Sequence, residues 1–279
     1  MSGTLYVTGT PIGNLEDITL RQLRILKEAA FIAAEDTRVT RGMLTHFDIH
    51  TPLTVCNENT PREALERIAD RIAAGESCAV VTDAGMPCIS DPGEKLVRIC
   101  RERGLPVEAV PGPSAVVTAL AVSGGSTAQF AFYAFLPTGP KVKKQRAAML
   151  AAIAREDKTS VLYEAPHKLC ATLEDLRGAL GGERVVSFCR ELTKVHEEVL
   201  RMTLDEAVAY YGEHAPRGEF VLVIDGRPPE DETCSLEDAV ALARRAVADG
   251  MPASAAAKQA AKETGIPKSE IYRVLHEGD

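Results

Sequence analysis

The chain has 279 residues, of which 45% are hydrophobic and none is tryptophan, and its formal net charge is −8. This length and composition predict a folded protein with more than one compact unit, and they exclude a disordered chain. The negative charge argues against a protein that coats nucleic acid without specificity, because such binding needs Lys and Arg to neutralise phosphates.

Export signals, apolar runs and cysteines in the sequence indicate the cellular compartment. The start of the chain lacks the pattern of an export signal, and no apolar run approaches the roughly 20 residues that span a bilayer. The seven cysteines form no C-x-x-C pair, which favours reduced and mostly buried thiols. We therefore expect a soluble, cytoplasmic protein with no membrane partner.

Short runs rich in Val, Ile and Ala alternate with helix-like segments along the chain. These runs predict strands at 4–9, 30–36, 77–83, 105–112, 130–135, 159–165, 184–188 and 219–225. Between them, helices are expected at 18–30, 60–75, 93–104 and 168–182, several of which end at glycine. Such alternation is typical of α/β domains with largely parallel sheets covered on both faces.

Composition changes divide the chain into four parts. The strand–helix pattern pauses at "VSGGSTAQ", so we expect one α/β domain over 1–122 and a second over 123–226. A polar, proline-rich linker follows at 227–234, and a helical appendage covers 235–279. Its segment 254–275 predicts a helix, a glycine turn and another helix, a pattern shared by nucleic-acid readers and plain packing modules.

Glycine- and proline-rich segments follow four of the predicted strands, where ligands bind in open α/β sheets. None matches the glycine patterns of a dinucleotide-binding fold or a P-loop. Taken singly, each is also an ordinary turn; Ser114, for example, suits the N-cap of a helix whose N–H groups would then be free. The segments are "GTPIGNLED" (9–17), "AEDTR" (34–38), "TDAGMP" (82–87) and "VPGPSA" (110–115).

Together with "YEAPHK" (163–168) and "RELTKVHEE" (190–198), these segments resemble the tetrapyrrole-methylase superfamily of S-adenosylmethionine-dependent methyltransferases. The closer resemblance is to its 16S rRNA (cytidine-2′-O)-methyltransferase branch, and it covers residues 4–226. It implies two α/β domains with the methyl donor bound in the cleft between them. It also implies a small C-terminal helical domain as a further part of the chain. The donor contacts that it implies are Pro11, Asp83, Gly85, Met86, Ser114, Ala115, Tyr163, Leu192 and Phe220.

The resemblance also implies a substrate and an assembly. The substrate is the ribose 2′-oxygen of cytidine 1402 in the 16S rRNA of the 30S subunit, not DNA. The family is usually homodimeric, and the apolar "AFYAFL" segment is a candidate interface. In one stretch the chain departs from the family: it reads "TVCNENTP" (54–61) where relatives are rich in histidine and glutamate, which leaves Glu58 and Asn59 as polar remnants.

The candidate catalytic residues are Glu35, Asp36 and Arg38, at the end of the second strand. A ribose hydroxyl is a poor nucleophile, so its methylation gains from a base as well as from alignment with the donor. Which acid acts as base is left open; alternatively, one caps the following helix and the other pairs with Arg38. No metal is expected, because the six histidines form no H-E-x-x-H or Cys/His cluster and His46 and His50 lie in a loop-like segment.

For RNA binding, the segment "PTGPKVKKQR" gathers Lys141, Lys143, Lys144 and Arg146, which suit phosphate contacts. Arg190 and Lys194 are lesser candidates. The alternative is a charged, solvated helix start.

Two other functions compete with the rRNA hypothesis. One is a tetrapyrrole (precorrin or uroporphyrinogen) or diphthine-type methylase, although the lysine-rich segment and helical tail suit RNA better than a polycarboxylate macrocycle. The other is a non-catalytic S-adenosylmethionine-binding regulatory module, against which the intact acid pair argues mildly.

Overall fold

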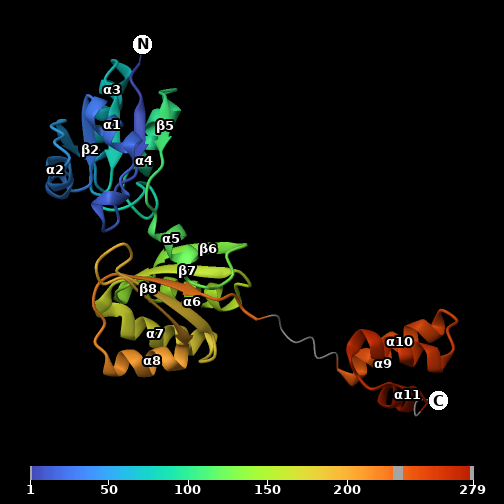
Figure 1. The fold of residues 1–279 in the computed structure, drawn as a ribbon. Helices are drawn as coiled ribbons and strands as arrows, with labels where there is room; N and C mark the ends of the chain where they lie inside the picture. Colours follow the sequence, from blue (N-terminus) through green and yellow to red (C-terminus); the bar gives the residue numbers. More distant parts are fainter. Residues whose placement is uncertain (1, 229–234, 277–279) are drawn as a thin grey trace. The chain divides into compact units, whose positions relative to one another are not determined.

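A computed structural model describes residues 2–228 and 235–276 (Figure 1). It divides the chain into two compact units, Met1–Arg227 and Pro228–Asp279. The predicted linker at 227–234 falls at this division, and from residue 229 onward it lies outside the described residues. Over the described ranges, no helix is both long enough and apolar enough to cross a membrane.

The first sheet has five parallel strands in the order β3-β2-β4-β1-β5. The sequence predicted four of them; the fifth, β3, has only three residues and lies half-buried at the edge. The strands are β1 (Leu5–Thr8), β2 (Phe31–Ala34), β3 (Leu53–Val55), β4 (Cys78–Val81) and β5 (Val107–Val110).

Helices cover both faces of this sheet, which explains why β2 and β4 are buried along their whole length. Helices α3 (Arg62–Ala73) and α4 (Glu94–Glu102) pack on one face, with Phe31 and Val80. On the other face lie α1 (Leu20–Glu28) and α2 (Thr37–His46), preceded in the chain by the short 3-10 helix η1 (Leu15–Asp17).

The strand order brings three motif segments together. Because β4, β1 and β5 are neighbours and parallel, the segments that follow them leave the sheet at one edge. Thr10 and Gly85 exchange two backbone hydrogen bonds there, of 2.9 Å and 3.1 Å. The loops after β1 and β4 therefore form one wall.

The second sheet has the order β6-β7-β10-β8-β9 and is mostly antiparallel. Only β6 and β7 run parallel, so the expectation of a largely parallel sheet is wrong for this domain. Strands β8 and β9 are joined by a short loop with no helix, and such a hairpin connection forces antiparallel pairing. Its strands are β6 (Phe130–Phe135), β7 (Thr159–Glu164), β8 (Val185–Arg190), β9 (Glu198–Thr203) and β10 (Phe220–Ile224).

The two faces of the second sheet carry different helices. One face packs against α6 (Lys143–Arg155), α7 (Pro166–Leu180) and α8 (Leu204–Glu213). The other face packs against α5 (Ala115–Val122), through Val116, Ala119 and Leu120, as Figure 1 also shows. Helix α5, which the sequence analysis assigned to the first α/β domain, thus packs on the sheet of the second.

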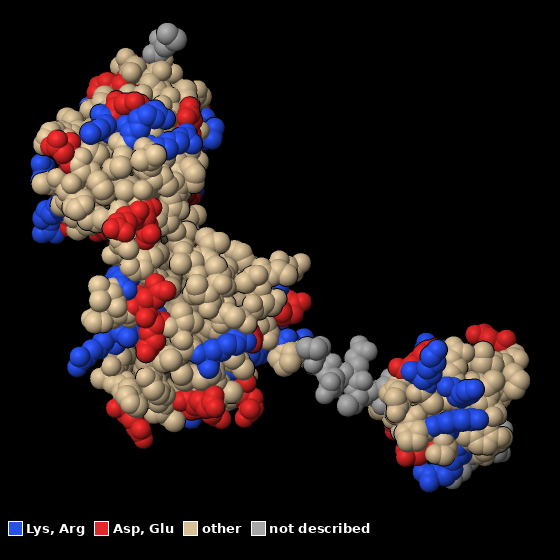
Figure 2. All heavy atoms as spheres, in the orientation of Figure 1, with Lys and Arg blue, Asp and Glu red and all other residues tan. Residues whose placement is uncertain are grey.

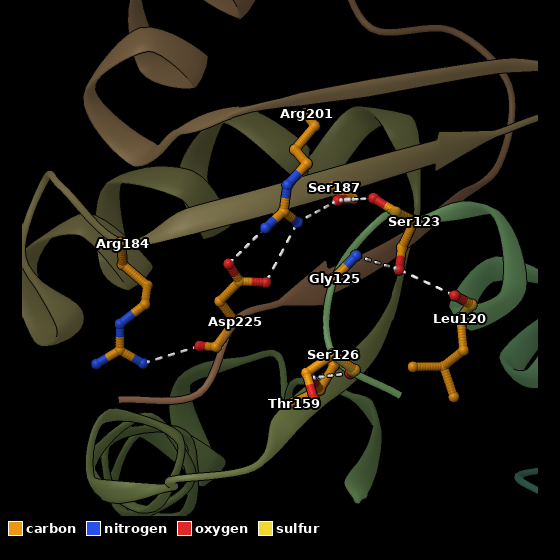
Figure 3. Close-up of polar contacts among 9 residues, drawn as sticks. All are labelled: Leu120, Ser123, Gly125, Ser126, Thr159, Arg184, Ser187, Arg201 and Asp225. Atoms are coloured by element: carbon orange, nitrogen blue, oxygen red, sulfur yellow. Dashed lines mark hydrogen bonds and ion pairs between the residues drawn. The ribbon is translucent and has the colours of Figure 1, made fainter. Parts of the chain in front are cut away.

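A polar network anchors the C-terminal end of α5 to the second sheet (Figure 3). The Ser187 hydroxyl donates to the Ser123 carbonyl at 2.8 Å and accepts from the Arg201 guanidinium at 2.9 Å. Arg201 in turn pairs with Asp225 at 2.6 Å. Because Ser123 and Ser187 are both buried, these bonds fix where α5 ends and hence where its first turn lies.

Replacing Ser187 with alanine is expected to lower the free energy of unfolding by about 1–3 kcal/mol, because the buried Ser123 carbonyl loses its donor. Urea unfolding measures this effect. The control is Arg24→Ala, which breaks an exposed i,i+4 pair with Glu28 and should cost at most about 0.5 kcal/mol. Equal losses in the two variants would contradict an anchoring role for Ser187.

The C-terminal unit is a three-helix body of α9 (Leu236–Ala248), α10 (Ala253–Thr264) and α11 (Lys268–His276). Its core consists mainly of alanines, with Val240 and Ile271. Helix α10 is followed by its C-cap, Gly265, which has φ +73° as glycines at helix ends commonly do. The predicted helix, glycine turn and helix at 254–275 are confirmed.

Candidate functional site

A cleft with a volume of about 500 Å³ lies between the two α/β domains of the first unit. Seven of the nine predicted donor contacts line it: Gly85, Met86, Ser114, Ala115, Tyr163, Leu192 and Phe220. Pro11 and Asp83 do not line it, although the residues that follow them, Ile12 and Ala84, do. The sequence motifs thus converge on one site of a size typical for small-molecule ligands.

The wall from the first domain depends on close backbone contacts. A Cβ at Gly9 would lie 2.9 Å from the Gly112 Cα and 2.8 Å from the Met86 Sδ. The buried Gln22 side chain crosses the same place, where its amide donates to the Gly9 carbonyl at 2.5 Å. No side chain larger than hydrogen fits at either glycine without moving this wall.

The first turn of α5 opens into the cleft. Ser114 is the N-cap residue but makes no side-chain cap hydrogen bond, so its hydroxyl does not occupy the N–H groups of the first turn. Both Ser114 and Ala115 line the cleft. Free N–H groups at a helix N-terminus favour a carboxylate or another anionic group of a ligand.

The wall from the second domain follows from strand register. Val221 of β10 pairs with Tyr163 of β7 and with Cys189 of β8, and all three line the cleft. Tyr163 contacts Phe135 with ring centroids 5.4 Å apart. Burial, followed by the charge of Asp91, raises the pKa of Tyr163 to about 12, so the phenol stays neutral. This wall offers aromatic and aliphatic surface.

Charged groups in the lining are mainly acidic: Asp91, Glu164, Glu191 and Glu219 face one lysine, Lys194. The Lys194 ammonium lies 2.8 Å from carboxylate oxygens of both Glu191 and Glu219. Burial alone would lower the pKa of Lys194, but its hydrogen bonds to the two acids outweigh burial and raise it. Such a lining favours a cationic ligand over an anionic one.

The predicted catalytic residues lie beside the cleft and do not line it. Asp36 is the N-cap of α2, accepts from the Arg38 N–H at 2.8 Å and pairs with the Arg38 guanidinium at 2.7 Å. Hydrogen bonds from Arg38 hold the pKa of Asp36 at about 2. Asp36 thus performs both tasks that the alternative divided between the two acids: it caps α2 and pairs with Arg38.

Glu35 lies differently from Asp36. Its carboxylate accepts from the Asp83 N–H at 3.2 Å, and burial raises its pKa. Glu58, in the segment that departs from the family, is close enough to contribute to this rise. An acidic group of side chains therefore lies at the ends of β2 and β4.

Asp91 is a lining residue that the candidate list from the sequence omitted. It lies in "ISDPG", between β4 and α4, and is half-buried. Burial, followed by the charges of Glu35 and Asp83, raises its pKa to about 6. The signal available in the sequence was an acid before Pro-Gly within a glycine-rich segment that otherwise supplies donor contacts.

The lysine-rich segment forms η2 (Pro140–Val142) and the start of α6. Lys141, Lys143 and Lys144 are exposed. Arg146 is not free in the same way: it donates to Asp175 at 2.7 Å and to Thr172 at 3.1 Å, so it joins α6 to α7. Arg190 and Lys194 are likewise held by carboxylates, Arg190 by Glu198 at 3.1 Å. Of the RNA contacts predicted from the sequence, Lys141, Lys143 and Lys144 are those that make no ion pair in the described structure.

The histidine and cysteine side chains are, by residue type, also candidates for a metal site. Among the residues that the structure describes, no group of three or more His, Cys, Asp or Glu could hold a metal ion. His46 ends α2, and His50 pairs with Asp48 at 3.0 Å.

Two known protein families match the two compact units of the chain. The family model of the tetrapyrrole (corrin/porphyrin) methylases matches residues 4–208, and that of the RsmI C-terminal HTH domain matches residues 233–278. A solved uroporphyrin-III C-methyl transferase from Thermus thermophilus, complexed with S-adenyl homocysteine, superposes with a TM-score of 0.57 at 20% identity, over 80% of this chain and 97% of that one. At that identity it shows the shared fold.

Closer relatives carry the name ribosomal RNA small subunit methyltransferase I. The protein from Halalkalibacterium halodurans is 44% identical over 279 residues, 99% of this chain and 95% of its own length. The protein from Thermotoga maritima is 42% identical over 225 residues, which cover 81% of this chain but 99% of that protein. The chain therefore belongs to the tetrapyrrole methylase family and, within it, to the ribosomal RNA small subunit methyltransferase I group.

Proposed function

We propose that this chain transfers the methyl group of S-adenosylmethionine to the 2′-oxygen of cytidine 1402 in the 16S rRNA of the 30S subunit, in the cytoplasm. The main support for this proposal is the acidic interdomain cleft, which is bounded by the uncapped first turn of α5. This cleft occurs in a chain of the rRNA small subunit methyltransferase I group. An enzyme role, rather than a regulatory one, follows from membership of a methylase family.

Each chemical group of S-adenosylmethionine has a matching surface in the cleft. The free N–H groups at Ser114 and Ala115 match its carboxylate, and the acids of the lining offset its positive sulfonium. Tyr163, Leu192 and Phe220 supply apolar surface for its adenosine, while Gly85 and Met86 bring backbone close to it. Pro11 and Asp83 do not line the cleft themselves; their proposed role is to position the neighbouring residues Ile12 and Ala84, which do. When bound, the donor supplies a methyl group on a sulfonium whose leaving group is a neutral thioether.

The target ribose enters the cleft, whereas the rRNA phosphates around it are held outside the acidic lining. Lys141, Lys143 and Lys144 are the proposed phosphate contacts in the first unit, because they are exposed and have no ion pair within the described ranges. Arg146 is proposed to fix the segment that presents them.

The C-terminal unit is the second proposed RNA surface. Figure 2 shows Lys and Arg side chains spread over the drawn face of this unit. Within residues 235–276, its basic side chains make no ion pair: Arg244, Arg245, Lys258, Lys262, Lys268 and Arg273.

A homodimer is also proposed. The edge strand β6 leaves Phe130 and Phe135 about half exposed, at 45% and 52%, and α5 leaves Val117 57% exposed. An exposed apolar strand edge of this kind favours pairing with a second copy.

A tetrapyrrole substrate is disfavoured by the same charges. A polycarboxylate macrocycle needs cations around it, whereas Lys194 is the one lysine of the lining and is already bound by two glutamates. The macrocycle is therefore kept as a competing acceptor in the test.

The test is transfer of labelled methyl from S-adenosylmethionine to 30S subunits that lack the modification. Free 16S rRNA, a precorrin precursor and buffer serve as parallel acceptors, and the labelled nucleotide is then mapped. We expect label at the 2′-oxygen of the proposed cytidine with intact subunits. Label in the macrocycle alone would overturn the substrate, and donor binding without transfer to any acceptor would favour a regulatory module.

A further inference from the structure

We propose that Asp91 is the group that accepts the proton of the attacking ribose hydroxyl. This inference rests on the proposed function, because it assigns a residue to the chemistry at the same cleft. It replaces Asp36, which the structure uses as a helix cap, and gives Glu35 the role of a charged neighbour.

The contacts of the surrounding acids single out Asp91. Around the cleft, Glu164 accepts from the Thr172 hydroxyl and the Ala165 N–H, and Glu191 and Glu219 hold Lys194. At the strand ends, Glu35 accepts from the Asp83 N–H, and Asp83 accepts from the Asp36 N–H at 3.1 Å. Across the part of the chain that the structure describes, the Asp91 carboxylate makes neither a hydrogen bond nor an ion pair. It is therefore the lining acid whose oxygens are open to a substrate hydroxyl.

The loop that presents Asp91 is held in a costly conformation. Cys88 and Ser90 have φ of +72° and +64°, in the left-handed region that non-glycine residues rarely adopt. The Cys88 N–H donates to the Pro92 carbonyl at 3.2 Å and closes the loop around Ser90. A strained and closed loop fixes the position of Asp91 at the cleft, as the alignment of a base with its substrate requires.

The electrostatics of Asp91 suit proton transfer near neutral pH. It is partly buried and faces Glu35 from the end of β2, Asp83 from the end of β4 and Tyr163 from β7. With a pKa of about 6, Asp91 is ionised at pH 7 and yet more basic than an ordinary aspartate. Tyr163 stays neutral in this range, so it does not compete for the same proton.

In the proposed step one bond forms, one breaks and one proton moves. The 2′-oxygen forms a bond to the methyl carbon while the carbon–sulfur bond breaks and leaves its electron pair on sulfur. The hydroxyl proton moves to the Asp91 carboxylate and is later released to water. The products are the 2′-O-methyl ribose, a neutral thioether and one proton.

The test compares Asp91→Asn with wild type and with Glu94→Gln on 30S subunits. Glu94 lies on α4, three residues away, is exposed and pairs with Arg98, so its substitution removes the same charge without touching the cleft. We expect kcat of Asp91→Asn to fall by about 10²–10⁴-fold, while the Kd of S-adenosylhomocysteine changes by about twofold at most. In wild type, kcat/KM should fall with acid below about pH 6, because protonated Asp91 cannot accept a proton.

Several outcomes would overturn the assignment. Unchanged kcat in Asp91→Asn would do so, as would a loss confined to the affinity for the donor, which would make Asp91 a sulfonium or hydroxyl contact of the donor. If Asp91→Asn fails to bind S-adenosylhomocysteine, Asp91→Glu decides: activity that keeps the acid limb supports a base, and activity without that limb rejects it. Wild type that labels no RNA instead rejects the proposed function, so the two failures remain distinct.

Discussion

Replacing Gly112 with alanine is expected to lower the free energy of unfolding by roughly 2–4 kcal/mol. The new Cβ would lie 2.1 Å from the Gln22 Nε2 and 3.1 Å from the Gly9 Cα. Gln22 then has to leave the Gly9 carbonyl, and a buried hydrogen bond is lost in addition to the steric cost. Since Gly112 leads directly into Ser114 and α5, the affinity for S-adenosylhomocysteine should also fall by about tenfold.

The measurements are urea unfolding and isothermal titration with S-adenosylhomocysteine. Gly42→Ala is the matched control, because Gly42 lies within α2 and a Cβ there meets nothing within 4 Å. That change should leave donor affinity unaltered and stabilise the fold by about 0.5–1 kcal/mol, as alanine does inside helices. Unaltered stability in Gly112→Ala would contradict the close backbone contact between the ends of β1 and β5.

The first-domain wall of the cleft could be predicted from the sequence because it requires unusual backbone, whereas the second-domain contacts Tyr163, Leu192 and Phe220 were implied only by the family resemblance. Gly85 and Gly112, with the prolines beside them, mark places where chain segments pass closely, and such residues are visible without a structure. The mostly antiparallel second sheet was not visible in the same way. Apolar periodicity reports burial, whereas strand direction depends on connections, and β9 is a half-exposed strand with weak patterning.

The catalytic acids illustrate a different limit of sequence reasoning. Glu35 and Asp36 follow a buried strand, which makes them candidate bases, yet the same position is where a helix cap is needed, and Asp36 serves as that cap. Asp91 carries no periodic signal at all. Its candidacy depends on a loop with positive φ angles and on the occupied oxygens of its neighbours, and both are properties of the folded chain.

The lysine-rich segment at the start of α6 shows the same limit of sequence reasoning. Four basic residues look equivalent in "KVKKQR", but helix periodicity turns Arg146 toward Asp175 and Thr172. Lys141, Lys143 and Lys144 stay exposed. The sequence therefore located the patch, and side-chain packing decided which of its members are available to phosphates.

Changing Lys141, Lys143 and Lys144 together to glutamate is expected to reduce kcat/KM for 30S subunits by about 10²-fold, through weaker RNA binding. The slope of log Kd against log salt should fall by about 2, since each phosphate contact on single-stranded RNA contributes roughly 0.7. Donor affinity should not change, because none of the three lysines lines the cleft. Filter binding over a range of salt concentrations gives the slope.

The control is the triple change of Lys27, Arg67 and Lys95 to glutamate, which alters the net charge by the same amount. These side chains are exposed on α1, α3 and α4 and make no ion pair in the described structure. If net charge alone governed RNA binding, both triple variants would lose affinity equally, and the lysine-rich segment would have no special role. A loss confined to the first triple instead identifies a local phosphate contact, which is how a chain with net charge −8 can bind RNA.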